Sequence, residues 1–156
     1  MIHNLDCNTP KGREYIKNQH SCLKKFCNTK GITYASTNDK KHAGVDAVLI
    51  KEHIVGICEV KCRDMTYNKL IYYGSYLISN EKIEKLQYLS NSLKCHGLLL
   101  VYLIPDDIIC YWYICDTDGN LLLNYDKKTS ETQATCNGGK AIRPNAFLPL
   151  QQMKTL

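Results

Sequence analysis

Two charged side chains interrupt a short apolar segment in the first half of the chain. The segment GICEVKCRD, residues 56–64, has the composition of a β-strand, yet it carries Glu59 and Lys61 near its middle. Successive side chains of a strand point to opposite faces, so these two share one face and the small apolar residues beside them share the other. A carboxylate and an ammonium group are expensive to bury, so their position needs an explanation.

A second carboxylate lies on the preceding segment. GVDAVLI, residues 44–50, contains Asp46 and is separated from the Glu59 segment by the turn-forming tripeptide KEH. An antiparallel hairpin would bring the two carboxylates near each other. Two carboxylates, a backbone carbonyl at Val60 and water make the oxygen-rich ligand set that Mg²⁺ or Mn²⁺ prefers. Lys61 could then position or deprotonate a water molecule, or offset negative charge during phosphoryl transfer.

The alternative for Glu59 and Lys61 is an ion pair on a half-exposed strand. Exposed ion pairs contribute only about 0–1 kcal/mol, so stability explains their placement poorly. Apolar residues flank the pair and a crossover helix is expected next, which predicts a central strand covered on both faces. We therefore interpret Asp46, Glu59 and Lys61 as a site, because buried ionisable groups cluster at functional positions. For Asp46 taken alone, a cap at the start of a strand stays open.

The helices and strands that must hold these residues are predicted by the spacing of apolar residues and by residues that begin or end helices and turns. Thr9 and Pro10 predict the start of a helix with an apolar stripe, and Gly31 predicts its end. A second helix is expected from Ser79 to a stop at Gly97. Strands are expected at residues 32–36, 45–50, 54–62, 98–104 and 108–115, with a weaker one at 121–125, short extended pieces within 129–149 and a tyrosine-rich, partly extended connection at 63–77.

This order of elements predicts an α/β fold with a central mixed β-sheet flanked by helices. The length of 156 residues favours a single domain, residues 1–156, that is long enough to bury a core. We expect the core of the fold at about residues 10–115 and a C-terminal extension at 116–156.

The charge of the chain is unevenly distributed. Of the formal net charge of +5, residues 11–41 hold eight Lys or Arg against Glu14 and Asp39. A basic N-terminal third suits a polyanionic partner, and the alternative is a solvated helix face. The longest apolar run, at 98–104, is too short to cross a membrane, so no membrane partner is expected. We expect an intracellular, cytoplasmic protein, and the abundance of Asn, Lys, Tyr and Ile suggests an AT-rich genome, such as that of a phage acting in its host cell.

The nine cysteines do not suggest a disulfide framework or a zinc site. Their number is odd, several lie inside apolar runs, and no CxxC pair occurs. We expect reduced thiols that behave as small apolar side chains.

Taken together, the motif and its elements resemble the PD-(D/E)xK nuclease superfamily, which has the restriction-endonuclease-like fold. The resemblance rests on a strand ending at Ser36, GVDAVLI, CEVK, the helix opened by LISNEKIEKLQYL and the strand GLLLVYLI. It is greatest to the archaeal-type Holliday-junction resolvases and their phage relatives. Val45 stands where the superfamily pattern has proline.

The resemblance implies a core of order αβββαβ and a metal-dependent phosphodiesterase that acts on branched or duplex DNA. Asp46 and Glu59 would be ligands of Mg²⁺ or Mn²⁺ together with the Val60 carbonyl, and Lys61 would be the catalytic lysine. Relatives often act as homodimers. Glu14 is the candidate for an acidic residue of the first helix, and Lys82 stands at about the place where some relatives have glutamine.

Several residues around the motif are candidates for contacts with nucleic acid. Ser36 could bind a phosphate or simply close its strand. Lys40, Lys41 and His42 could follow a phosphate backbone, and the alternative is a solvated loop. For Glu14 the alternative is a favourable charge near a helix N-terminus. Tyrosines in the connection could stack on bases or complete a core; they are Tyr67, Tyr72, Tyr73 and Tyr76.

Two further classes of function compete with the nuclease. The first is a member of the same fold that binds nucleic acid without catalysis, and the second is a protein-interaction module. A nuclease or nucleic-acid-binding protein predicts DNA affinity that salt weakens strongly, whereas an interaction module predicts weak and salt-insensitive affinity.

Overall fold

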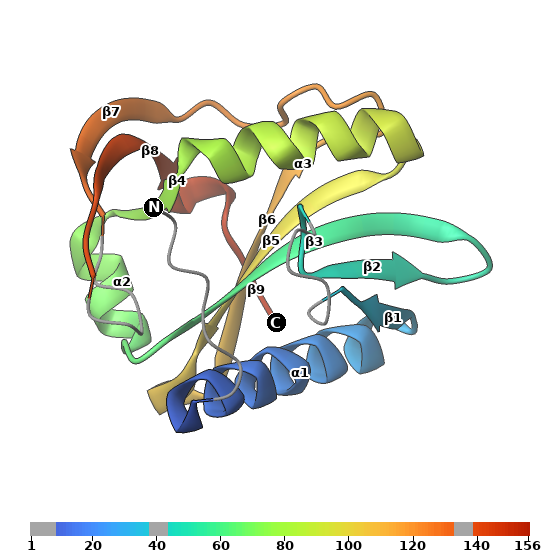
Figure 1. Ribbon diagram of the computed structural model, residues 1–156, viewed down its shortest axis with the longest axis horizontal. Helices are drawn as coiled ribbons and strands as arrows, with labels where there is room; N and C mark the ends of the chain where they lie inside the picture. The colour runs from blue at the N-terminus through green and yellow to red at the C-terminus, as the bar shows by residue number, and fades with distance from the viewer. Residues whose placement is uncertain (1–8, 38–43, 133–138) are drawn as a thin grey trace.

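A six-stranded sheet with a helix on each face forms the centre of the protein (Figure 1). The computed structural model describes residues 9–37, 44–132 and 139–156. The strands lie in the order β1 (Thr33–Ser36), β2 (Ala47–Ile50), β3 (Ile54–Arg63), β5 (His96–Leu103), β6 (Ile108–Cys115) and β9 (Lys154–Thr155). β3 and β5 are parallel, and the other neighbours are antiparallel. The predicted α/β class with a mixed sheet is confirmed.

The first helix, α1 (Pro10–Lys30), covers one face of this sheet. The Thr9 hydroxyl accepts a hydrogen bond from the Gly12 N–H at 3.0 Å, and Gly31 ends the helix in the left-handed conformation with a φ of 66°. Both ends agree with the sequence prediction, because a threonine cap and a terminal glycine satisfy backbone groups that the helix leaves unpaired. The buried face of the helix packs on the strands through Cys22, Leu23, Phe26 and Cys27.

The second long helix, α3 (Asn80–Leu93), covers the opposite face beside a small second sheet. That sheet has the order β4 (Ser75–Ser79), β8 (Ile142–Pro149) and β7 (Asp126–Glu131), all antiparallel. The core between these layers includes Ile83 and Leu86 of α3 and Trp112 of β6, whose indole N–H donates to the Pro149 carbonyl at 2.9 Å. Residues 116–156 therefore contribute strands to both sheets.

Three expectations for local structure were wrong or incomplete. Residues 63–77 are extended at both ends, in β3 and β4, but between the strands they contain a short helix, α2 (Tyr67–Tyr73), which Thr66 caps at its start and Gly74 ends with a φ of 73°. Residues 121–125 form an isolated bridge from Leu121 to Cys115, and the strand follows in the polar segment β7. Contacts with distant strands decide these segments, and such contacts override local propensity.

The third wrong expectation concerns the end of α3. The helix ends at Leu93 with Lys94 in the left-handed conformation, and Gly97 lies inside β5. A Cβ atom on Gly97 would lie 2.6 Å from Cys115 Sγ and 2.7 Å from Ser90 Oγ. The glycine is needed for the close packing of α3 and β6 on β5, not to stop a helix.

All seven cysteines within the described residues are free and buried. Cys22, Cys27, Cys58 and Cys62 lie in the core under α1, whereas Cys95, Cys110 and Cys115 lie in the core under α3. Burial raises the pKa of these thiols above the ordinary value. The expectation of thiols that act as apolar side chains is confirmed for these seven residues.

None of the described helices is long and apolar enough to cross a membrane.

The close packing at Gly97 gives a test of the fold. We expect Gly97→Ala to lower the free energy of unfolding by about 1–3 kcal/mol, because the added methyl group overpacks the contact with Cys115. The measurement is urea unfolding of both proteins. The same change in a Cys115→Ala background should be less destabilising, because the sulfur atom is gone. Equal losses in the two backgrounds would contradict this explanation.

Candidate active site

Asp46 lies where the pairing between β2 and β3 stops. Ala47 is paired with Cys58, and one residue earlier the Asp46 N–H donates to the Cys58 carbonyl at 3.0 Å. Its side-chain Oδ2 then accepts a hydrogen bond from the Val60 N–H at 2.7 Å. A carboxylate therefore takes the place of a backbone partner at the point where β2 has ended. The prediction that Asp46 belongs to the first hairpin strand was off by one residue, because β2 begins at Ala47.

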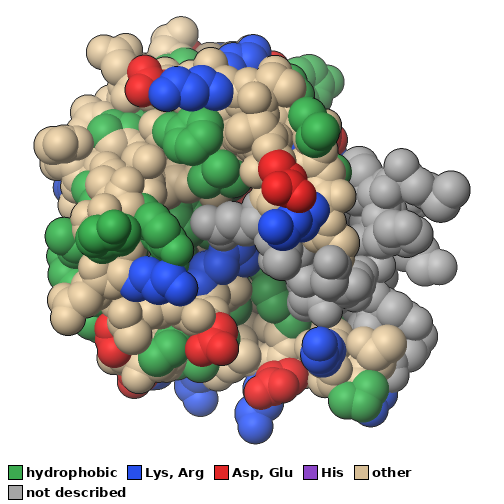
Figure 2. Space-filling view, turned by 90° about the vertical axis from the view of Figure 1, so that its left-hand side faces the viewer, with side chains coloured by type: hydrophobic (Ala, Val, Ile, Leu, Met, Phe, Trp, Pro, Cys, Tyr) green, Lys and Arg blue, Asp and Glu red, His purple; other side chains and the backbone are tan. Residues whose placement is uncertain are grey.

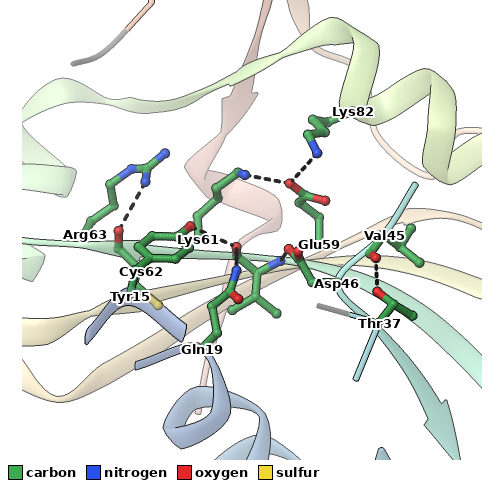
Figure 3. A network of polar contacts seen from close by, with 11 residues as sticks. Tyr15, Gln19, Thr37, Val45, Asp46, Glu59, Lys61, Cys62, Arg63 and Lys82 are labelled. Atoms are coloured by element: carbon green, nitrogen blue, oxygen red, sulfur yellow. Dashed lines mark hydrogen bonds and ion pairs between the residues drawn. The ribbon is translucent and has the colours of Figure 1, made fainter. Parts of the chain in front are cut away.

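Glu59 is buried at the centre of the motif strand, with an exposed fraction of 1%. Its Oε1 atom accepts from Lys61 Nζ at 2.6 Å and from Lys82 Nζ at 3.0 Å, as Figure 3 shows. Lys61 comes from the same face of β3, as the alternation predicts, and Lys82 comes from the first turn of α3. The strand is central and covered on both faces, so the motif is not an exposed ion pair.

The two carboxylates have opposite electrostatic environments. Burial, together with the nearby charge of Glu59, raises the pKa of Asp46 to about 6. Burial alone would also raise the pKa of Glu59, but Lys61 and Lys82 outweigh it and hold this pKa below its usual value. Glu59 is thus a stable anion, whereas the charge on Asp46 is only weakly compensated.

Lys61 stays charged in this environment. Burial would lower the pKa of its ammonium group, but Glu59, helped by Tyr15 and Asp46, raises it above the ordinary value. A lysine held in this state cannot accept a proton, so the ammonium can orient or neutralise a reacting group but cannot act as a base.

Two residues of α1 reach the motif strand from the other side. Tyr15 donates its hydroxyl to the Val60 carbonyl at 3.4 Å, and Gln19 Nε2 donates to the same oxygen at 3.3 Å. Both bonds are long and therefore weak. Burial raises the pKa of Tyr15 to about 12, so its hydroxyl keeps its proton. No pattern in the sequence connects Tyr15 or Gln19 with the motif, although their spacing of four residues puts them on one helix face.

The oxygen atoms around Asp46 are of the kind that binds a hard divalent cation. The hydrogen bonds named above use Oδ2 of Asp46 and Oε1 of Glu59, and the Val60 carbonyl is held only weakly. A cation would also compensate the charge that raises the pKa of Asp46. No group of three or more His, Cys, Asp or Glu side chains suited to a metal occurs within the described residues, so a cation here would have the two carboxylates and the Val60 carbonyl as protein ligands, with water completing its coordination.

The other predicted residues divide into three groups. Lys82 lies in the site. Ser36 is exposed at the end of β1 opposite Ala47. Glu14 is exposed on α1, and the hydrogen bonds from this helix to the Val60 carbonyl come from Tyr15 and Gln19. The candidates Lys40, Lys41 and His42 lie outside the described residues.

The structure separates the tyrosines that the sequence grouped together. Tyr76 has an exposed fraction of 1% and belongs to the core, and Tyr67 packs at its margin. Tyr72 and Tyr73 on α2 are exposed, at 88% and 52%. Tyr72 and Tyr73 are therefore exposed enough to stack on a ligand, whereas Tyr76 is not.

Sequence reasoning also missed Arg63, which follows Lys61 by two residues on the same face of β3 (Figure 3). A signal existed in the alternation of CEVKCR, because residues 59, 61 and 63 share one face of a strand.

Comparison of the chain with models of protein families and with curated proteins finds no match.

The raised pKa of Asp46 predicts an unusual dependence of stability on pH. Unfolded, the carboxyl group loses its proton near 3.8, and folded it keeps the proton to about 6, so the folded state binds more protons between these values. The free energy of unfolding should therefore fall as pH rises through this window. In buffer with EDTA, Asp46→Asn should be more stable than wild type by about 1–2 kcal/mol at pH 7.5, since asparagine cannot ionise.

This difference should close below pH 4, and urea unfolding at the two pH values measures it. Asp126→Asn, which changes an exposed carboxylate on β7, is the matched control and should show no such pH dependence. A destabilised Asp46→Asn at pH 7.5 would contradict the electrostatic argument.

Proposed function

We propose that the protein is a divalent-metal-dependent endonuclease of the PD-(D/E)xK type that hydrolyses phosphodiester bonds in DNA. The observation that carries the proposal is the convergence of Asp46, Glu59 and Lys61 at the centre of a covered strand. The cost of burying these charges makes a purely structural role a poor explanation.

The order of elements supports the same proposal. Apart from α2 and β4, which lie between the motif strand and the second long helix, α1, β1, β2, β3, α3 and β5 follow one another as αβββαβ. β3 and β5 are parallel neighbours joined by the segment that includes α3, which is the crossover expected for that order.

Asp46, Glu59 and the Val60 carbonyl would hold Mg²⁺ or Mn²⁺. A bound ion of this kind supplies a water molecule of lowered pKa and polarises a phosphoryl oxygen. The chain itself orients the ligands: the Val60 N–H fixes Asp46, and Tyr15 and Gln19 hold the Val60 carbonyl.

Lys61 would stabilise charge rather than move a proton. Its ammonium group is held 2.6 Å from Glu59 and stays protonated, so it can contact a phosphoryl oxygen on which negative charge develops. Lys82 of α3 gives a second positive charge, and its Nζ atom is 3.0 Å from the same oxygen of Glu59.

A basic surface on α1 supports DNA as the substrate. Exposed cations follow this helix along its length, namely Lys11, Arg13, Lys17, Lys24, Lys25 and Lys30. Lys25 is paired with Asp107, and the others add to a positive field that attracts a phosphate backbone.

The resemblance to junction resolvases favours branched DNA as the substrate. A homodimer would present two such sites to one branched molecule. Sedimentation of the protein with and without a four-way junction measures whether it is a dimer when free and when bound to DNA.

One observation favours a second candidate, a non-catalytic member of the same fold. Two lysines bind one oxygen of Glu59, so the charge of this carboxylate is compensated without a metal ion. This candidate predicts salt-sensitive DNA binding without cleavage, whereas a protein-interaction module predicts neither.

The decisive experiment is a cleavage assay with Mg²⁺ and Mn²⁺. Its substrates are a four-way junction, a linear duplex, a single strand and an RNA. We expect metal-dependent cutting of DNA by wild type and a loss of at least about 100-fold in Glu59→Ala and Lys61→Ala, because each removes a charge from the reacting centre. Lys85→Ala, which removes an exposed cation of α3 paired with Glu81, is the matched control and should cut normally.

Cutting that survives Lys61→Ala would refute the catalytic role, and cutting without a divalent metal would refute the metal site. Salt-sensitive binding with no cutting of any substrate would favour the second candidate. A rise in melting temperature with Mn²⁺ in wild type but not in Asp46→Asn would support the metal site independently of catalysis.

A further inference from the structure

Arg63 is the last residue of the motif strand and continues its charged face. Glu59, Lys61 and Arg63 alternate along β3, and Figure 3 shows the Arg63 and Lys61 side chains extending to the same side of the strand. Two residues of a strand span about 6.6 Å, which is comparable with the spacing of successive phosphates on one nucleic-acid strand. Arg63 is therefore placed one phosphate away from the group that Lys61 would contact.

The positive charge of Arg63 lacks an acidic partner. None of the ion pairs between described residues includes it, whereas Lys61 and Lys82 share Glu59. A guanidinium group is charged at every working pH, so this charge cannot be removed by losing a proton. A cation that is partly buried without a counter-charge is costly unless an anion binds to it.

The hydrogen bonds of the guanidinium group leave one edge available. Nη1 donates to the Cys62 carbonyl at 3.1 Å, which fixes the plane of the group. Nε is buried and has no hydrogen-bond partner of normal geometry among the described residues. The Nε–Nη2 edge is the one that binds an oxyanion through two parallel hydrogen bonds.

Tyr76 lies beside this edge and positions it. The guanidinium carbon is 5.9 Å from the centre of the Tyr76 ring, within the range of a cation–π contact. The buried Tyr76 hydroxyl also lies within reach of the guanidinium group and interacts with it. Tyr76 therefore helps to fix the orientation of Arg63 on the face of β3 that carries Lys61.

We propose that Arg63 binds a phosphate group of the substrate next to the phosphate at which cleavage occurs, with Tyr76 as a positioning residue. The inference rests on the proposed function for the identity of the substrate. On the face shown in Figure 2, Lys and Arg side chains lie in and beside a hollow near the middle of the molecule, where positive charge favours the approach of an anion.

The test measures DNA binding without cleavage. A labelled oligonucleotide is titrated in EDTA at several salt concentrations with wild type, Arg63→Gln, Arg63→Lys and Lys51→Gln. Lys51 is exposed at the tip of the β2–β3 hairpin, at the opposite end of β3, and is the matched control for loss of one positive charge.

We expect Arg63→Gln to weaken binding about tenfold and to lower the slope of log K against log salt by about 1. Arg63→Lys should have the wild-type slope of log K against log salt, because lysine keeps the positive charge. Its affinity should stay below that of wild type, because lysine cannot form two parallel hydrogen bonds with a phosphate. Lys51→Gln should leave affinity nearly unchanged. If Arg63→Gln does not fold, Arg63→Lys still decides the matter, and wild-type affinity in that variant would overturn the proposal.

Two sources of the phosphate are distinguished by the oligonucleotide. The same sequence is compared with and without a 5′-phosphate, and inorganic phosphate alone is tested by its effect on the melting temperature. Equal losses for both oligonucleotides in Arg63→Gln indicate an internal phosphate, and a loss confined to the phosphorylated one indicates a terminal phosphate. Stabilisation by inorganic phosphate should be present in wild type and absent in Arg63→Gln.

Failure of this inference is distinct from failure of the nuclease. Unchanged affinity and salt slope in a folded Arg63→Gln would make Arg63 structural, while metal-dependent cutting could still stand. Loss of affinity in Arg63→Gln, with no cutting by wild type, would keep the phosphate site and reject catalysis.

Discussion

Burial of the Glu59 carboxylate is the constraint on which the rest of the site depends. An isolated anion at the centre of a covered strand would be strongly destabilising, and Glu59 is tolerated because two ammonium groups bind the same oxygen. One of these groups comes from β3 and the other from α3. The position of α3 on the sheet is therefore tied to the charge of the site as well as to apolar packing, because a shift of the helix would remove one of the two ammonium groups that compensate Glu59.

The early end of β2 has an equally local cause and a functional effect. β3 is paired with β5 from Gly56 to Arg63 on one side, but on its other side the ladder with β2 ends at Cys58. The peptide groups at Val60 are then open to side chains, and Asp46 from the hairpin and Gln19 from α1 occupy them. Shortening one strand by a few residues thus converts a stretch of ordinary sheet into a place where carboxylate and carbonyl oxygens gather.

Local signals made much of this arrangement predictable. Thr9 and Gly31 mark the ends of α1, and strict alternation placed Glu59 and Lys61 on one face. Other features depend on distant pairing and carry no local signal. The polar segment DKKTSE becomes β7 because β8 lies beside it, and Tyr15 reaches Val60 only because α1 packs across the sheet. Gly97 was misread because a glycine needed for close packing looks the same in sequence as one that ends a helix.

The distribution of the thiols has a consequence for how motions of this protein can be observed. Four buried cysteines lie under α1 and three under α3, and burial keeps them protonated and unreactive while the layers stay closed. A thiol reagent therefore modifies each of these seven cysteines only when the layer around it opens. The protein carries natural reporters on both sides of its central sheet, so the rates at which its two layers separate can be followed one cysteine at a time without any added label.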